Sequence, residues 1–135
     1  MSVGQFVDLE QLGVVYLAAA LPGVKVGIDV PKGPGIRVTR SPGSNDADRA
    51  LPRLDIECFA PDRASMWILA GRANNALAEL AGDVVELNVG TDDAPETQAV
   101  QVDDVNTITD PVPGYWSPTV ERSVAVYEFD VRTEF

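Results

Sequence analysis

Hydrophobic and polar positions alternate most regularly in two stretches of the chain. In residues 53–60, RLDIECFA, the alternation predicts a strand with one buried face. We expect Leu54, Ile56 and Cys58 on the buried face, and Asp55 and Glu57 on the exposed one. Residues 122–132 give the clearest strand pattern of the chain. We expect its inward face to carry Ala125, Tyr127, Phe129 and Val131, and its outward face Glu128, Asp130 and Arg132.

Two segments have the apolar spacing of an amphipathic helix. The longer one follows Pro61, with Asp62 as its N-cap and Gly82 at its C-terminal end. Its apolar stripe consists of Met66, Ala70, Ala73, Leu77 and Leu80. The shorter one, LEQLGVVYLAAAL, follows Asp8, with Gln11 in a capping-box position. Because the shorter helix is apolar on two sides, we expect it to lie deep in the fold or to meet another subunit.

The remaining segments complete the predicted topology. Residues 24–30 and 36–40 alternate on either side of a Pro-Gly cluster, which predicts a hairpin. Residues 83–89 form a strand with Val85, Leu87 and Val89 in register, followed by an acidic turn at 90–97 and a short strand at Val100 and Val102. Residues 106–118 are predicted to be a loop. The order of elements predicts a single α+β domain over residues 1–135, with a mostly antiparallel sheet and two main helices packed on one face.

Residues 41–52, SPGSNDADRALP, are predicted to be a second loop because they contain almost no apolar side chain. Twelve such residues cannot offset their own ordering entropy, which is roughly 1–2 kcal/mol per residue. We therefore expect this loop to be mobile in a free subunit and to be ordered by neighbouring subunits.

Composition changes this picture mainly through charge. The net charge is −11, and residues 73–121 contain ten acidic side chains and no Lys or Arg. Nucleic-acid affinity depends on neutralising phosphates, so we do not expect the chain to bind DNA or RNA. The acidic segment 83–110 has two interpretations: solvated loops that keep the protein soluble, or a channel lining that repels passing DNA. We expect neither a membrane-spanning helix nor a signal peptide, which makes the cytoplasm the default compartment.

The residue types favour a protein without catalysis. The sequence has no histidine, which removes the commonest general base and metal ligand. Its one cysteine, Cys58, is expected to be a small core residue and not a reactive thiol. We therefore expect no enzyme, and no catalytic, cofactor-binding or metal site.

Three sets of residues have side chains suited to chemistry or to an interface. The pairs Asp55/Glu57 and Glu128/Asp130 have the chemistry of a glycosidase pair, but we expect them to be exposed charges near Arg53 and Arg132. Asp92-Asp93 and Asp103-Asp104 offer calcium ligands without the spacing of a calcium loop. Trp67 and Trp116 are candidate interface anchors, although a helical tryptophan is as often simply packed.

Nearly the whole chain resembles the tail terminator, or tail completion, proteins of bacteriophages with long non-contractile tails. The resemblance rests on the order of the elements and on four stretches: LAAALPG, IRVTRSPG, RLDIECFAPDRASMWILAGRANNAL and VAVYEFDVR. The acidic region 83–110 departs from the pattern of that family.

The resemblance implies a structural virion protein that forms a ring, generally hexameric, at the head-proximal end of the tail. Its partners would be further copies of itself, the tail tube protein and the head–tail connector protein. Genomic DNA would pass through without specific binding, no membrane would be involved, and assembly would take place in the host cytoplasm. Two alternatives stay open: another connector component (a stopper or adaptor), or a small ligand-binding domain or enzyme with a concave pocket.

Overall fold

The computed structural model describes residues 7–41 and 51–133, which form two helices and one six-stranded mixed sheet. The elements in chain order are α1 (Leu9–Ala20), β1 (Lys25–Gly27), β2 (Gly35–Ser41), β3 (Arg53–Ala60), α2 (Arg63–Leu80), β4 (Val84–Asn88), β5 (Thr97–Ser117) and β6 (Val120–Arg132). The strand order in the sheet is β1-β2-β3-β6-β5-β4. All pairs except β1–β2 are antiparallel. The predicted α+β class is therefore confirmed.

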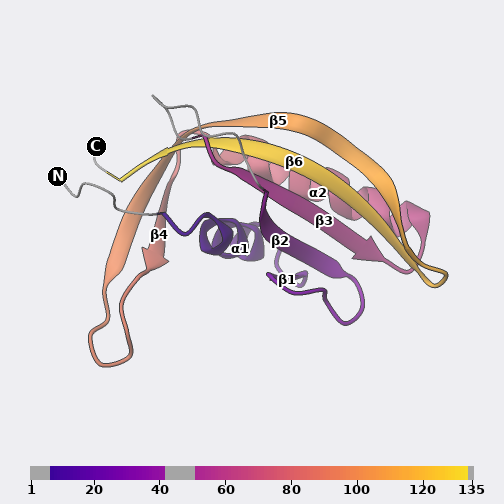
Figure 1. The fold of residues 1–135 in the computed structure, drawn as a ribbon, viewed down its shortest axis with the longest axis horizontal. Coiled ribbons are helices and arrows are strands. Elements are labelled where there is room, and N and C mark those ends of the chain that lie inside the picture. Colours follow the sequence, from indigo (N-terminus) through magenta and orange to yellow (C-terminus); the bar gives the residue numbers. More distant parts are fainter. Residues whose placement is uncertain (1–6, 42–50, 134–135) are drawn as a thin grey trace.

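Both helices cover the same face of the sheet, and the hydrophobic core lies between them and the strands. Figure 1 shows β5 and β6 arching over α1, with α2 running behind β3 and β6. The inward positions predicted for the strands at 53–60 and 122–132 belong to this core except Val131, which is partly buried and packs against it. Four of the five predicted stripe residues of α2 also belong to the core, and the fifth, Met66, is fully buried. The period-2 and period-3.6 patterns thus identified the faces that pack together.

Both helices begin at the predicted N-caps, but the capping-box role predicted for Gln11 is wrong, because its side chain binds the Asn88 backbone instead. The Asp8 carboxylate accepts a hydrogen bond from the Gln11 amide (3.1 Å), and the Asp62 carboxylate accepts one from the Ser65 amide (2.7 Å). At the end of α2, Gly82 has a φ of +93°, a conformation that costs glycine little. Its amide donates to the Val102 carbonyl, so the end of α2 is joined directly to β5.

The predicted hairpin of residues 24–30 and 36–40 is wrong, because β1 and β2 run parallel. The register pairs Lys25 with Gly35 and Gly27 with Arg37. A three-residue strand is only about 10 Å long, so the residues between the two strands can lead the chain back to its starting end. Gly33 in this connection has a φ of +91°, which favours a sharp change of direction.

The predicted loop at 106–118 is also wrong, because most of it belongs to the long strand β5. This segment pairs with β6 through several bulges, including one between Thr109 and Val112. Its β-branched and aromatic residues favour a strand, and its prolines are tolerated because no strand of the described chain pairs with the outer side of this half of β5. The predicted acidic turn is present between β4 and β5. Val89, predicted to be in register, lies past the end of β4 and is exposed.

The prediction that residues 41–52 are mobile falls almost entirely on residues 42–50, which lie outside the described part of the chain.

Helix α1 approaches the sheet closely at Gly13. A Cβ atom on Gly13 would lie 2.9 Å from Leu54 Cδ1 and 2.9 Å from Val38 Cγ1. Both neighbouring side chains are fully buried, and the β-branched Val38 has little rotamer freedom to move away. The absence of a side chain at residue 13 therefore sets the distance between α1 and strands β2 and β3.

We predict opposite effects for two helical glycine substitutions. Gly13→Ala should lower the free energy of unfolding by about 1 kcal/mol or more, because overpacking outweighs the gain in helix propensity. Gly71→Ala, on the open side of α2 where an added Cβ meets nothing within 4 Å, should raise it by about 0.5–1 kcal/mol. Urea denaturation of both variants measures the difference. Equal shifts in the same direction would contradict the close approach at Gly13.

Candidate interaction surfaces

The sheet face opposite the helices carries a cluster of charged and aromatic side chains, which we call the Glu57 cluster: Arg37, Glu57, Phe59, Trp116 and Arg122. Arg37 binds the Glu57 carboxylate through two hydrogen bonds, Nε to Oε1 (2.7 Å) and Nη2 to Oε2 (2.9 Å). Arg122 Nη1 donates to Glu57 Oε2 at 3.2 Å. Glu57 is only 5% exposed. The hydrogen bond that Arg37 donates to Glu57 is the main cause of the raised pKa of the Arg37 guanidinium.

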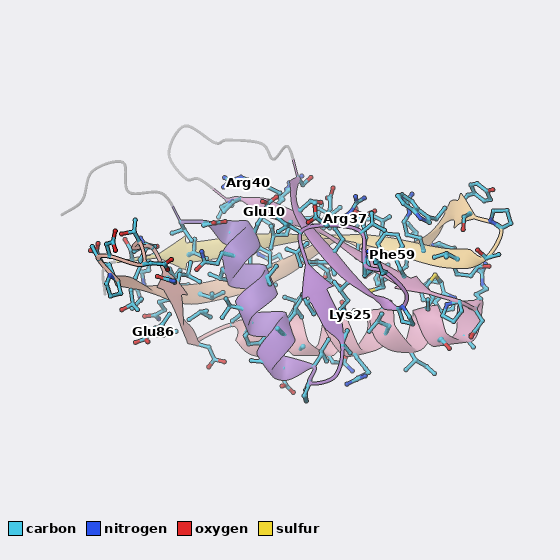
Figure 2. All side chains as sticks on the ribbon, turned by 90° about the horizontal axis from the view of Figure 1, so that it is seen from below. Glu10, Lys25, Arg37, Arg40, Phe59 and Glu86 are labelled. Atoms are coloured by element: carbon cyan, nitrogen blue, oxygen red, sulfur yellow. The ribbon has the colours of Figure 1, made fainter. Side chains whose placement is uncertain are left out.

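Aromatic rings cover this ion-pair network. The rings of Phe59 and Trp116 meet edge to face, with centroids 5.2 Å apart. The guanidinium carbons of Arg37 and Arg122 lie 5.7 and 5.2 Å from the Trp116 centroid, within cation–π range. Gly114 leaves room for this stacking, since a Cβ there would lie 3.0 Å from Arg122 Nη2. Figure 2 labels Arg37 and Phe59 at this cluster.

Glu57 shows where the sequence prediction was wrong. Its position on the polar face of β3 was predicted correctly, but exposure was not, because Arg37, Arg122 and Trp116 enclose it. The register places Arg37 and Val124 directly beside Glu57, with Arg122 two residues along β6 from Val124. The sequence does show opposite charges on the outward faces of these strands. Without the register between the strands, it cannot predict that they meet at Glu57.

The other residues weighed for chemistry lie apart from this cluster. Glu128, expected to be an exposed charge near Arg53, is only partly exposed and pairs with Arg53 (3.0 Å), and Asp103 pairs with Arg132 (3.0 Å). Asp92 and Asp93 lie in the β4–β5 connection, whereas Asp103 and Asp104 lie within β5. Within residues 7–41 and 51–133, no group of three or more acidic or cysteine side chains is arranged to hold a metal ion.

Cys58 is buried beneath α2, as predicted. Burial raises the pKa of its thiol to about 12, although a hydrogen bond with Ser123 acts in the opposite direction. The thiolate is the reactive form of cysteine. Cys58 therefore has a packing role at neutral pH.

The open edges of the sheet are poorly suited to pairing with another strand. The outer half of β5 contains Pro111 and Pro113 and is interrupted by bulges. On β4, the backbone of Asn88 is occupied by the Gln11 side chain, which accepts from the Asn88 amide (2.9 Å) and donates to the Asn88 carbonyl (3.2 Å). β1 has only three residues. Prolines, bulges and short strands are the usual means of preventing edge-to-edge association.

Several large apolar side chains are exposed on the described surface. Tyr115, near the β5–β6 turn, is 80% exposed, and Ile68 on α2 is 65% exposed. Val89, at the start of the β4–β5 connection, is 45% exposed. Figure 1 shows the β5–β6 turn and the β4–β5 connection at opposite ends of the molecule. The two predicted interface anchors are both partly exposed. Trp116 packs within the Glu57 cluster against Arg122, and Trp67 lies beside Arg63.

A shallow groove lies beside the first half of α2, and we call it the apolar groove. Its volume is about 330 Å³. Its lining includes Val24, Pro34, Pro61, Ile68, Leu69 and Arg72. The groove thus brings together the start of β1, the start of β2, the end of β3 and the exposed side of α2.

Comparison with known proteins identifies no family: no family model and no curated protein matches this chain. Neither described helix is long and apolar enough to cross a membrane.

We predict that Glu57 is a major stabilising residue. Glu57→Gln should lower the free energy of unfolding by about 2–3 kcal/mol, because two partly buried guanidinium groups lose their counter-charge. Glu128→Gln is the matched control: its single ion pair with Arg53 is more exposed, so the loss should stay below about 1 kcal/mol. Urea denaturation provides both values. Equal losses would show that the Glu57 cluster contributes no more than a surface ion pair.

We also predict that the protein loses stability at alkaline pH. The unfolded Cys58 thiol ionises near its ordinary pKa of 9.0, whereas the folded thiol has a pKa of about 12. Above pH 9.0 the unfolded chain therefore binds fewer protons than the folded one, and the free energy of unfolding falls as pH rises towards 12. Burial also raises the pKa of Tyr127, from 10.0 to about 12, which adds in the same direction.

Urea denaturation at increasing pH, from neutrality to about pH 10, measures this loss. Cys58→Ala should show a smaller loss than the wild type over the same interval, because the Tyr127 contribution remains. Identical pH profiles would mean that the Cys58 thiol ionises equally well in the folded chain.

Proposed function

We propose that this protein is a structural virion protein of the tail-terminator type and has no catalytic activity of its own. Copies of the chain form a closed ring at the head-proximal end of the phage tail. The ring terminates the tail tube and joins it to the head–tail connector. Its subunits are assembled in the host cytoplasm and remain in the virion.

The observation that carries this proposal is the exposure of large apolar side chains at opposite ends of the molecule. Tyr115 lies beside the β5–β6 turn and Val89 begins the β4–β5 connection, and Figure 1 shows these two connections at opposite ends of the molecule. Two different apolar surfaces at opposite ends suit a head-to-tail contact, in which one surface of each copy meets the other surface of the next. Such contacts produce a ring when the rotation between copies closes.

The charge distribution supports the same proposal. The ten acidic residues of 73–121 have no Lys or Arg among them, and repetition around a ring would multiply their field. Acidic groups that face a central channel would repel the DNA backbone, so the genome would pass without specific binding.

Ring formation by the purified full-length protein is the direct test. We expect native mass spectrometry and negative-stain images at micromolar concentration to show closed rings of one size. Mixed with tubes of the tail tube protein, the rings should cap tube ends and stop further elongation. A chain that stays monomeric under these conditions, with or without tubes, would contradict the proposal.

A further inference from the structure

The apolar groove has a cationic border. Arg72 lines the groove, and Arg63, at the start of α2, lies in sequence between the lining residues Pro61 and Ser65. Neither Arg63 nor Arg72 forms an ion pair with any residue of the described chain. Asp62, at the same helix start, is already held by the amide and hydroxyl of Ser65. A ligand for this groove should therefore combine apolar surface with negative charge.

The β4–β5 connection, residues 89–96, has that combination, and we call it the acidic loop. Its sequence is VGTDDAPE, with three carboxylates and the exposed apolar side chains of Val89 and Pro95. Within the described residues, no ion pair neutralises Asp92, Asp93 or Glu96. The loop and the groove are therefore complementary in charge and in apolar character.

The acidic loop is held in one shape before any contact is made. The Glu96 backbone carbonyl accepts hydrogen bonds from the amides of Val89 (2.9 Å) and Gly90 (3.2 Å), and Thr91 and Ala94 exchange backbone hydrogen bonds. Gly90 is required for this shape, because a Cβ there would lie 2.3 Å from the Ala94 carbonyl oxygen. A loop that is already ordered loses little conformational entropy on binding.

The loop cannot reach the groove of its own chain. Figure 1 shows the β4–β5 connection at one end of the molecule and the start of α2, beside the groove, at the other. A contact between the two must therefore join two copies. It would use a different surface on each copy, and like ends would repel each other.

We propose that the acidic loop of one copy docks in the apolar groove of the next copy. Val89 and Pro95 contact the apolar lining, while Asp92 and Asp93 face Arg63 and Arg72. This inference rests on the proposed ring and assigns the surfaces that form it. The proposed contact is made by side chains and a preformed loop. It does not require pairing along the open edges of the sheet.

Charge reversal on each side tests the contact. The loop variant is Asp92→Lys with Asp93→Lys, and the groove variant is Arg63→Glu with Arg72→Glu. Each alone should weaken assembly by about tenfold or more, measured by sedimentation and native mass spectrometry. A mixture of the two variants should assemble again, because the reversed loop then meets the reversed groove and each intact surface meets its intact partner. The control variant, Asp104→Lys with Asp110→Lys, changes the net charge by the same amount as the loop variant but at residues outside the loop. It should leave assembly unchanged.

The outcomes separate this inference from the proposed ring. If both charge-reversed variants form rings as readily as the wild type, the loop-in-groove contact is overturned and the proposed ring is not. Loss of assembly in the control variant as well, or no recovery on mixing, would show that net charge and not this contact is responsible. A wild-type chain that forms no ring would overturn the proposed function and this contact together. Circular dichroism establishes that each variant is folded.

Discussion

The burial of one face of the sheet under both helices is the constraint on which the rest of the structure depends. It requires α1 to approach β2 and β3 closely at Gly13, and it places the apolar residues of β3 and β6 against α2. Among the described residues, no helix covers the opposite face of these strands. Charged and aromatic residues meet on that face, and where Glu57 becomes buried there, two arginines satisfy its charge and two aromatic rings cover them. The Glu57 cluster is thus a consequence of packing both helices on one side.

The sequence predicts local structure well where a short pattern decides it. The caps at Asp8 and Asp62, the turn at Gly82 and the inward faces of β3 and β6 all follow from residue types within a few positions. Pairing between strands is a different problem, because the same alternation suits a parallel or an antiparallel neighbour. This is why the β1–β2 pair was predicted as a hairpin. The Thr- and Pro-rich half of β5 was missed because its strand conformation depends on β6, which lies beside it.

The surfaces were harder to predict than the core, for the same reason. Exposure of Val89 depends on where β4 ends, and burial of Glu57 depends on side chains from β2, β5 and β6. The apolar groove is assembled from four separate segments, so no single stretch of sequence indicates it. Charge segregation, in contrast, is visible in the sequence itself. The structure adds that the acidic residues nearest the β4–β5 turn lie at the end of the molecule opposite the groove.

This geometry limits how copies of the chain can associate. Bulges and prolines on β5, and the Gln11 side chain on β4, remove the simplest route, which is a sheet continuing from one copy into the next. Any association between copies would then depend on side chains. Two ends of different charge favour a head-to-tail arrangement over a symmetric pair, because like ends repel. A head-to-tail contact gives an open filament unless the rotation between neighbouring copies is fixed at an angle that closes the ring. The hydrogen bonds within the acidic loop, together with the restriction at Gly90, hold that loop in one shape. In the proposed loop-in-groove contact, a rigid loop would fix such an angle.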